Sequence, residues 1–256
     1  MPPSPSDDDA RRAAVAPSPP DGADGGAAVA GRTRGRGLSE QRVVAAAREL
    51  LVTGGPDQVV VREVARRLGV APSSLYKHVA GRDDILTLLI AECWAELASA
   101  CEHALDGAPT TGLRARLRAT SLAFRAWALA HPAEYQLVLG YPLPGYVAPP
   151  GGPTDAASRR VGAAFYAQYD AARRAGRLRT PVLPPPQGVA GTPRAGAALP
   201  EFSVDETYLF VMGFQRLQGL VAFEVSGQQL GGITDHAAYV LDQVERLLDE
   251  ILTPGD

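Results

Sequence analysis

The polar side chains with the clearest chemical use lie close together in the segment 73–78. They are Ser73, Ser74, Tyr76, Lys77 and His78. Hydroxyl, ammonium and imidazole groups hydrogen-bond to base edges and phosphate oxygens when a helix presents them to DNA. Lys77 is the single lysine among the 25 lysines and arginines of the chain. Its flexible point charge can meet a guanine edge or a phosphate. The segment therefore predicts contacts with a polyanion.

Two short helices and a tight turn are predicted to hold these side chains. The apolar spacing favours a helix over residues 61–68, a turn at Gly69, and a second helix that Pro72 opens and that continues to about His78. Glycine suits the turn because it adopts positive φ, and Ala65 leaves room where the helices touch. The positions expected to face inward are Val64, Leu68, Val70 and Leu75. This arrangement is a helix-turn-helix, whose second helix enters the major groove of DNA.

Helices before and after the motif complete an N-terminal domain predicted over residues 38–84. The first helix is expected to begin at Ser39, which can cap it, with Leu38 and Val43 at the positions of a hydrophobic staple. A long fourth helix is expected over about residues 82–105, with acidic residues in its first turn that complement the helix dipole.

Charge is unevenly distributed, although the chain as a whole carries only −3. Residues 31–90 carry +4, whereas residues 1–30 and 91–256 carry −3 and −4. A basic stretch between acidic ones indicates a polyanionic partner for that stretch alone.

Residues 1–37 lack any periodicity and predict a disordered tail with a basic end. Three arginines alternate with small residues at that end, namely Arg32, Arg34 and Arg36. They either follow a DNA minor groove or form a solvated basic linker. The sequence leaves both interpretations open.

Residues 85–253 are predicted to form a second helical domain. The expected helices cover about residues 111–130, 134–139, 154–175, 203–225 and 234–252. Flexible loops rich in proline and glycine are expected near 141–153 and 180–200. No segment shows the alternation of a strand, so the expected class is all-α. The architecture would be a three-helix helix-turn-helix domain followed by a helical ligand-binding and dimerisation domain.

Aromatic residues on the inward faces of the later helices suggest a pocket for an apolar or amphipathic small molecule. The candidates are Phe124, Trp127, Tyr135, Phe165, Tyr166, Tyr169, Phe210 and Phe214. The alternative is that they only form a core. Arg125, His131 and Glu224 are polar groups within apolar stretches; each could orient a ligand, or be solvated or ion-paired.

Composition and motifs argue against other classes. Hydrophobic residues make up 46 % and charged residues 21 %, which is a soluble globular balance. No apolar run reaches the roughly 18 residues that a membrane span needs, and the first residues lack the features of a secretory signal, so we expect a cytoplasmic protein. Cys93 and Cys101 are too far apart on one helix to form a disulfide, and they are either half-buried thiols or redox sensors. No phosphate-binding, nucleophile or metal motif is present, so we expect no enzyme activity, no cofactor and no metal.

The run REVARRLGV, the string LYKHV and the acidic start of the following long helix together resemble the TetR family of bacterial transcriptional regulators. The resemblance covers about residues 38–89. The segments WALAHPAEYQLVLG and RLQGLVAFEVSGQ resemble the WHG-type C-terminal subtype of this family.

The resemblance implies a role for individual residues. Ser73 and Lys77 match base-facing positions, and Arg62 matches a position that reaches a base in some relatives. The remaining matches are phosphate or backbone contacts, at Ser74, Tyr76 and Arg82. Two residues depart from the family pattern: Val60 stands where a capping threonine is common, and Val79 where phenylalanine is common. The contact that the threonine makes is therefore in doubt.

The resemblance also implies a function. We expect a ligand-responsive transcriptional regulator, most simply a repressor that a small molecule releases from palindromic double-stranded DNA, acting as a homodimer through its last two helices. The alternative is a small-molecule-binding or protein-interaction module with a vestigial DNA-binding domain.

Overall fold

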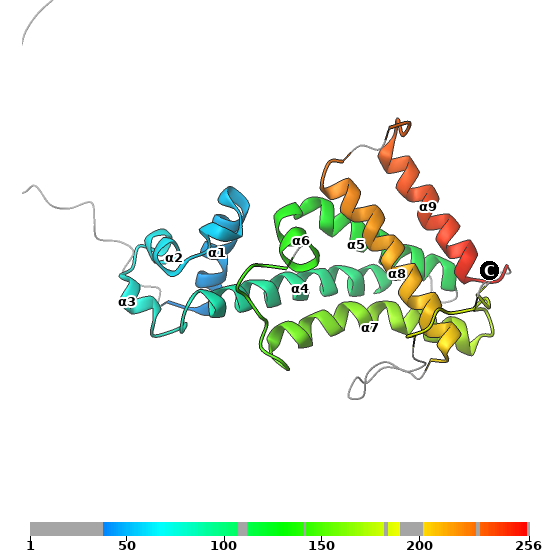
Figure 1. Ribbon diagram of the computed structural model, residues 1–256, viewed down its shortest axis with the longest axis horizontal. Coiled ribbons are helices and arrows are strands. Elements are labelled where there is room, and N and C mark those ends of the chain that lie inside the picture. The colour runs from blue at the N-terminus through cyan, green and yellow to red at the C-terminus, as the bar shows by residue number, and fades with distance from the viewer. Residues whose placement is uncertain are drawn as a thin grey trace, which may run out of the picture. The chain divides into compact units, whose positions relative to one another are not determined.

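The computed structural model describes residues 38–106, 112–140, 142–181, 184–189, 202–228 and 231–254. Regular structure in these ranges is helical apart from one isolated antiparallel bridge between Leu178 and Leu252, which confirms the expected all-α class (Figure 1). The predicted tail with its arginines at 32, 34 and 36, and most of the loop 180–200, lie outside the described residues.

The helices follow one another in chain order. They are α1 (Glu40–Gly54), a short 3-10 turn η1 (Pro56–Gln58), α2 (Val61–Leu68), α3 (Pro72–Leu75), α4 (Arg82–Asp106), α5 (Leu113–Ala130), α6 (Pro132–Leu139), α7 (Pro153–Arg174), α8 (Val204–Val225) and α9 (His236–Ile251). We call α1 to α3 the head and α5 to α9 the body. In Figure 1, α4 runs from the head into the body.

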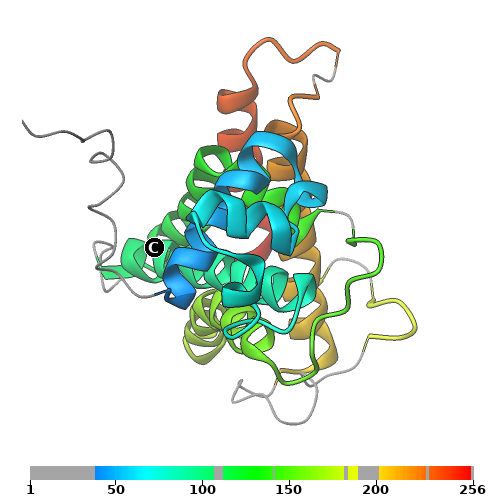
Figure 2. The same ribbon diagram turned by 90° about the vertical axis from the view of Figure 1, so that its left-hand side faces the viewer.

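The head packs three short helices around a small apolar core. Ser39 caps α1 by accepting a hydrogen bond from the Arg42 backbone N–H, as predicted. Gly55, at φ 78°, ends the helix. The core side chains are fully buried and come from all three helices and the loops, among them Val43, Val59, Val64, Ala65 and Leu75. Figure 2 shows the head end-on.

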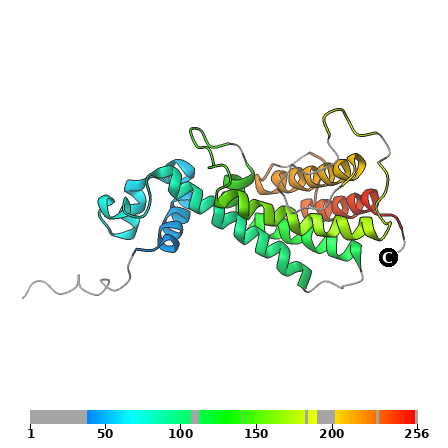
Figure 3. The same ribbon diagram turned by 90° about the horizontal axis from the view of Figure 1, so that it is seen from below.

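The body is built around α4. Its buried face packs along α7 and α5, and it also contacts α1 and α6. Helices α8 and α9 contact each other and α5, on the side away from α4 (Figure 3). Ser203 and Glu206 form the predicted capping box at the start of α8. No helix among the described residues has the length and apolarity of a membrane span.

Several predicted boundaries were wrong by two or three residues, among them the start of α6, which is Pro132 rather than Glu134. Helix α9 begins at His236 rather than Thr234, because the Asp235 side chain accepts a hydrogen bond from the Ala238 backbone and acts as the cap. Helix α3 ends at Leu75 rather than near His78. The His78 N–H bonds three residues back to the Leu75 carbonyl, so the last turn tightens and the α-helix stops.

Candidate nucleic-acid interface and effector pocket

The turn between α2 and α3 has the geometry that the sequence predicted. Gly69 adopts φ 68° and ψ 31°, a left-handed conformation that suits glycine. The Val70 N–H bonds to the Ala65 carbonyl and the Gly69 N–H to the Arg66 carbonyl, which closes the end of α2. Pro72 then opens α3 at a position where no amide hydrogen is needed. The turn fixes the direction of α3 relative to α2.

Most of the predicted DNA-contacting side chains point to solvent. Leu75 and Val79 are buried, so the side chains between them lie on the outer surface of the head. Ser73, Lys77 and His78 are exposed, Ser74 is half-buried, and Tyr76 is 56 % exposed. More than half of the Tyr76 side chain is therefore open to a ligand outside the chain. The arrangement therefore brings hydroxyl, phenol, ammonium and imidazole groups onto one small surface.

Arg62 extends this surface from α2. Its side chain is 86 % exposed, and its Nε lies 3.7 Å from a Glu63 carboxylate oxygen. Glu63 receives a shorter hydrogen bond of 2.8 Å from Arg66 Nε, and this bond lowers the pKa of Glu63. The Arg62 guanidinium thus remains available for a ligand outside the chain.

Arg82 differs from the other predicted contacts because it holds the head together. Its Nε donates to the Val59 carbonyl at 3.1 Å, and its terminal nitrogen donates to the Pro56 carbonyl, also at 3.1 Å. The side chain is 29 % exposed. Arg82 therefore ties the start of α4 to the loop that leads into α2. Val60, the N-cap of α2, makes no side-chain cap, in agreement with its departure from the family pattern.

An ion-pair cluster joins the head to α4 and α6, and sequence reasoning missed it. Arg48 on α1 contacts Glu96 on α4 through two bonds of 2.8 Å. Its Nη1 also lies 4.0 Å from the carboxylate of Glu134 on α6, which is only 4 % exposed. The sequence feature that could have indicated this cluster is that Arg48 directly follows Ala46 and Ala47, which lie on the buried face of α1.

The predicted aromatic pocket is a packed cluster in this structure. Phe124 makes edge contacts with Tyr135, Phe165 and Phe214 at centroid distances of 6.2, 6.3 and 5.9 Å. Tyr166 and Phe210 stack at 3.8 Å, and Tyr169 meets Phe210 edge-on at 5.2 Å. These rings come from α5, α6, α7 and α8.

The space left among these rings is small. A cavity of about 10 Å³, lined in part by Phe165, Tyr169 and Phe214, remains between α5, α7, α8 and α9. That volume holds about one water molecule. The backbone at Gly213 lies close to α7, since a Cβ atom at that position would lie 2.5 Å from the Tyr169 hydroxyl and would force it to shift. Burial raises the pKa of Tyr135 to about 12, so its hydroxyl stays protonated and bonds to the Gln218 carbonyl at 3.2 Å.

The ring contact recorded for Trp127 is with His131 and not with the other predicted pocket residues. Trp127 stacks on His131 at a centroid distance of 5.2 Å, and it is 6 % exposed. Its indole N–H has no hydrogen-bond acceptor among the described residues. Arg125 and Glu224, which the sequence left as ligand contacts or an ion pair, form an ion pair between α5 and α8, with 2.7 Å from Nε to Oε2.

The two cysteines are buried thiols, and the described residues hold no metal-binding cluster. Cys93 and Cys101 are fully buried, and burial raises the pKa of each thiol to about 12, which disfavours redox sensing. In the described ranges, no cluster of three or more histidine, cysteine, aspartate or glutamate side chains could hold a metal ion.

Two family models and several curated regulators match this chain. The family model described as "Bacterial regulatory proteins, tetR family" matches residues 43–88, and the model described as "Tetracyclin repressor-like, C-terminal domain" matches residues 117–250. The chain is 30 % identical over 237 residues to HTH-type transcriptional regulator Rv1816 of Mycobacterium tuberculosis, covering 88 % of this chain and 96 % of the relative. The same figures hold for regulator Mb1846 of Mycobacterium bovis.

Solved structures show the same fold. Regulatory protein SCO4313 superposes with a TM-score of 0.64 at 24 % identity, over 82 % of this chain and 94 % of that one. A tetR-family regulatory protein from Rhodococcus RHA1 superposes with a TM-score of 0.58 at 18 % identity, over 84 % of this chain and 98 % of that one.

Proposed function

The chain belongs to the TetR family of bacterial transcriptional regulators, and on that premise we propose that it is a dimeric repressor that a small molecule releases from a palindromic operator. The observation that carries the proposal is the exposed polar surface of the 73–78 segment on a head whose core is fully packed. The net charge of +4 on residues 31–90 argues against a vestigial head, because it suits a polyanionic partner. We place the protein in the cytoplasm, where it can reach DNA.

On this proposal the side chains divide between two tasks. Ser73 and Lys77 read base edges, and Arg62 reaches a further base. The remaining contacts fix the register on the backbone and come from Ser74, Tyr76, His78 and Arg82. Arg82 can do so only with donors that its two carbonyl bonds leave over.

The outer face of α8 and α9 supports dimerisation. Phe223 and Tyr239 are 44 % and 36 % exposed, which is unusual for large apolar side chains that lie near each other. Both line a hollow of about 270 Å³ between the two helices, together with Leu220 and Ile233. A second copy of α8 and α9 would complete a four-helix bundle. The two reading helices of a symmetric dimer would then lie about 34–36 Å apart.

The effector would enter the aromatic cluster around Phe124. Because the rings pack against Phe124 and the cavity beside Phe165 and Phe214 measures only about 10 Å³, an effector must move at least one ring to bind. The buried indole N–H of Trp127 offers a donor that lacks an acceptor. An effector that binds only the opened cluster shifts the protein toward that geometry, and release from DNA follows if the opened geometry spaces the heads wrongly.

The test has two steps. DNA that the full chain selects from a random pool, and DNA from its own promoter, are assayed for mobility shift at low salt, followed by a screen for compounds that abolish the shift. We expect a palindromic site and a concentration-dependent shift. Retention of no palindromic DNA would favour the alternative module with a vestigial head.

A further inference from the structure

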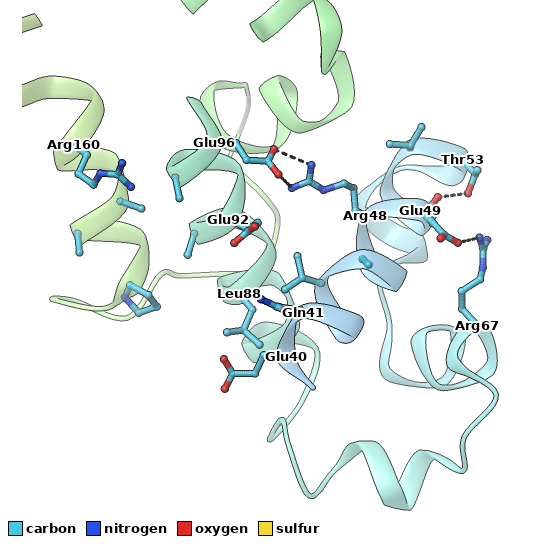
Figure 4. Close-up of a pocket in the computed structure, with 18 residues that line it drawn as sticks. Glu40, Gln41, Arg48, Glu49, Thr53, Arg67, Leu88, Glu92, Glu96 and Arg160 are labelled. Atoms are coloured by element: carbon cyan, nitrogen blue, oxygen red, sulfur yellow. Dashed lines mark hydrogen bonds and ion pairs between the residues drawn. The ribbon is translucent and has the colours of Figure 1, made fainter. Parts of the chain in front are cut away.

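A wide groove lies outside the aromatic cluster, between α1, α4 and the first turns of α7 (Figure 4). Its volume is about 1150 Å³. Small-molecule sites in proteins typically measure roughly 300–1000 Å³, so the groove has room for a ligand without any rearrangement. The aromatic cluster, in contrast, is filled in the same structure.

The groove follows one face of each helix that borders it. On α1 the lining residues recur in pairs four apart, from Glu40 and Gln41 at one end to Val52 and Thr53 at the other. The stretch from Glu40 to Thr53 spans thirteen helical steps, which correspond to roughly 20 Å of length at 1.5 Å per step. An extended ligand therefore fits better than a round one.

The floor of the groove is apolar. Helix α4 contributes Leu88, Ala91 and Ala95, and the opposite walls contribute Val44 from α1 and Ala157 from α7. The small alanine side chains are what leaves the groove open. Val52, at one end, is 60 % exposed although it is apolar.

The charges of the groove are not balanced. All three of its arginines are already ion-paired: Arg48 with Glu96, Arg67 with Glu49, and Arg160 with Glu102. The two remaining carboxylates of the lining, on Glu40 and Glu92, have no ion-pair or hydrogen-bond partner in the part of the chain that the structure describes. Figure 4 shows Glu92 over the middle of the groove, between Arg160 and Arg48. The groove therefore presents net negative charge along an apolar floor.

We propose that this groove is a second ligand site, which binds an amphiphilic organic cation with an extended apolar chain. The cationic group lies beside Glu92, with Glu40 as the second carboxylate, and the chain covers Leu88, Ala91 and Ala95. The arginines do not repel the ligand, because their charges are already neutralised. An organic anion would meet unpaired carboxylates and no free cation, so the same groove disfavours it.

The site would act on the head directly. Its walls belong to α1 of the head and to α4 and α7, and one wall contains the Arg48–Glu96 pair that joins them. A ligand that fills the groove fixes the distance between these helices. Any effect on DNA affinity rests on the proposed DNA-binding function, but binding itself does not.

The binding test is titration calorimetry on the full chain without DNA. Decyltrimethylammonium, below its micelle concentration, is the probe; decyl sulfate tests the sign of the charge, and tetramethylammonium tests the need for a chain. We expect saturable binding of decyltrimethylammonium and no saturable binding of decyl sulfate or tetramethylammonium. Glu92→Gln should weaken it about two- to fivefold, as for an exposed charge pair, and Glu40→Gln should add a similar factor. Asp106→Asn, an exposed carboxylate on the same helix outside the groove, is the matched control.

A second variant tests the place of binding. Ala95→Phe fills the floor and should weaken binding at least tenfold, whereas Ala163→Phe, on the exposed face of α7, should not. If Ala95→Phe does not fold, Glu92→Gln decides. The proposal is overturned by equal binding of decyl sulfate, by binding that both groove variants leave unchanged, or by a change in oligomeric state of Ala95→Phe, which would make the groove an interface between copies. A mobility shift on the same samples tests DNA binding separately.

Discussion

Lys77 gives the simplest test of base reading at the scale of one residue. Its ammonium is exposed on the outer side of the 73–78 segment, beside the 56 % exposed Tyr76. We expect Lys77→Ala to lower affinity for the selected operator by about 1–3 kcal/mol and to relax specificity at one base pair. Binding to a panel of operators with single base changes measures this. Equal loss on every sequence would assign Lys77 to a phosphate instead.

Arg82 combines a structural task with its proposed contact to DNA. Arg82→Ala leaves the carbonyl of the buried Val59 without its side-chain donor, and a buried polar group without a partner costs about 1–3 kcal/mol. The Pro56 carbonyl also loses the Arg82 donor but keeps its bond from the Val59 N–H. We expect a loss of about that size in the free energy of unfolding, measured by denaturant titration. Arg82→Lys keeps the charge but cannot reach both carbonyls with one forked group, so it should not restore stability.

The outcome that would contradict this role is an Arg82→Ala variant as stable as the parent chain but weaker on DNA. In that case the guanidinium would serve only the phosphate backbone.

Single residues show where sequence reasoning stops. The exposed polar side chains of the 73–78 segment could be predicted because helical periodicity assigns Leu75 to the core and its neighbours to the surface. The pairing of Arg48 with Glu96 could not be predicted from the sequence, because a contact between residues 48 positions apart depends on how α1 packs against α4. The same holds for the Arg125–Glu224 pair, where the sequence offered each residue but not its partner.

Helices were predicted well where a local signal marks their ends. The Ser203 and Glu206 capping box, the Ser39 cap and the left-handed Gly69 each act within a few residues, so they can be read directly. The end of α3 could not be predicted in this way. It depends on a change from an i→i−4 to an i→i−3 backbone hydrogen bond at His78. Periodicity also could not predict that the aromatic rings pack together without an open pocket, because the packing between four helices sets the volume left among them.

An ion-pair ladder between α5 and α9 is predicted to make stability depend on pH. Glu245 accepts hydrogen bonds from Arg114 and Arg118 at 2.8 and 2.5 Å. Burial acts to raise the pKa of Glu245, but these bonds outweigh it and lower the pKa below the ordinary value of 4.5. A carboxyl with a lowered pKa stabilises the fold above its unfolded-state pKa, and this contribution is lost as pH falls through the folded-state pKa.

We therefore expect Glu245→Gln to cost at most about 1 kcal/mol near neutral pH, because the side chain is partly exposed, and to cost nothing in strong acid. Urea unfolding at several pH values measures the difference. Asp242→Asn, which removes a pair within α9 alone, is the control. A cost that stays constant at every pH would show that charge on Glu245 is not the cause.

At the scale of the whole molecule, three features lie along α4. The head meets α4 just past its midpoint through Arg48 and Glu96, the groove lies against the middle of the helix, and α5 and α7 pack along it. A shift of α4 would therefore move the helices that carry the aromatic cluster and the head at the same time. In the proposed function, a small molecule controls DNA affinity only if two heads are held at one spacing, so the proposal also requires a contact between copies.

The face on α8 and α9 that holds Phe223 is where we expect that contact. Phe223→Arg places a charge within an apolar interface that offers it no partner, so the dimer should dissociate. Sedimentation should then show monomers, and affinity for the palindromic operator should fall by at least about tenfold, because two linked heads bind as one unit. Val147→Arg is the matched control: Val147 is 83 % exposed and lies in the loop before α7, outside α8 and α9 and the hollow between them. A Phe223→Arg variant that sediments like the parent chain would place the dimer contact on another face.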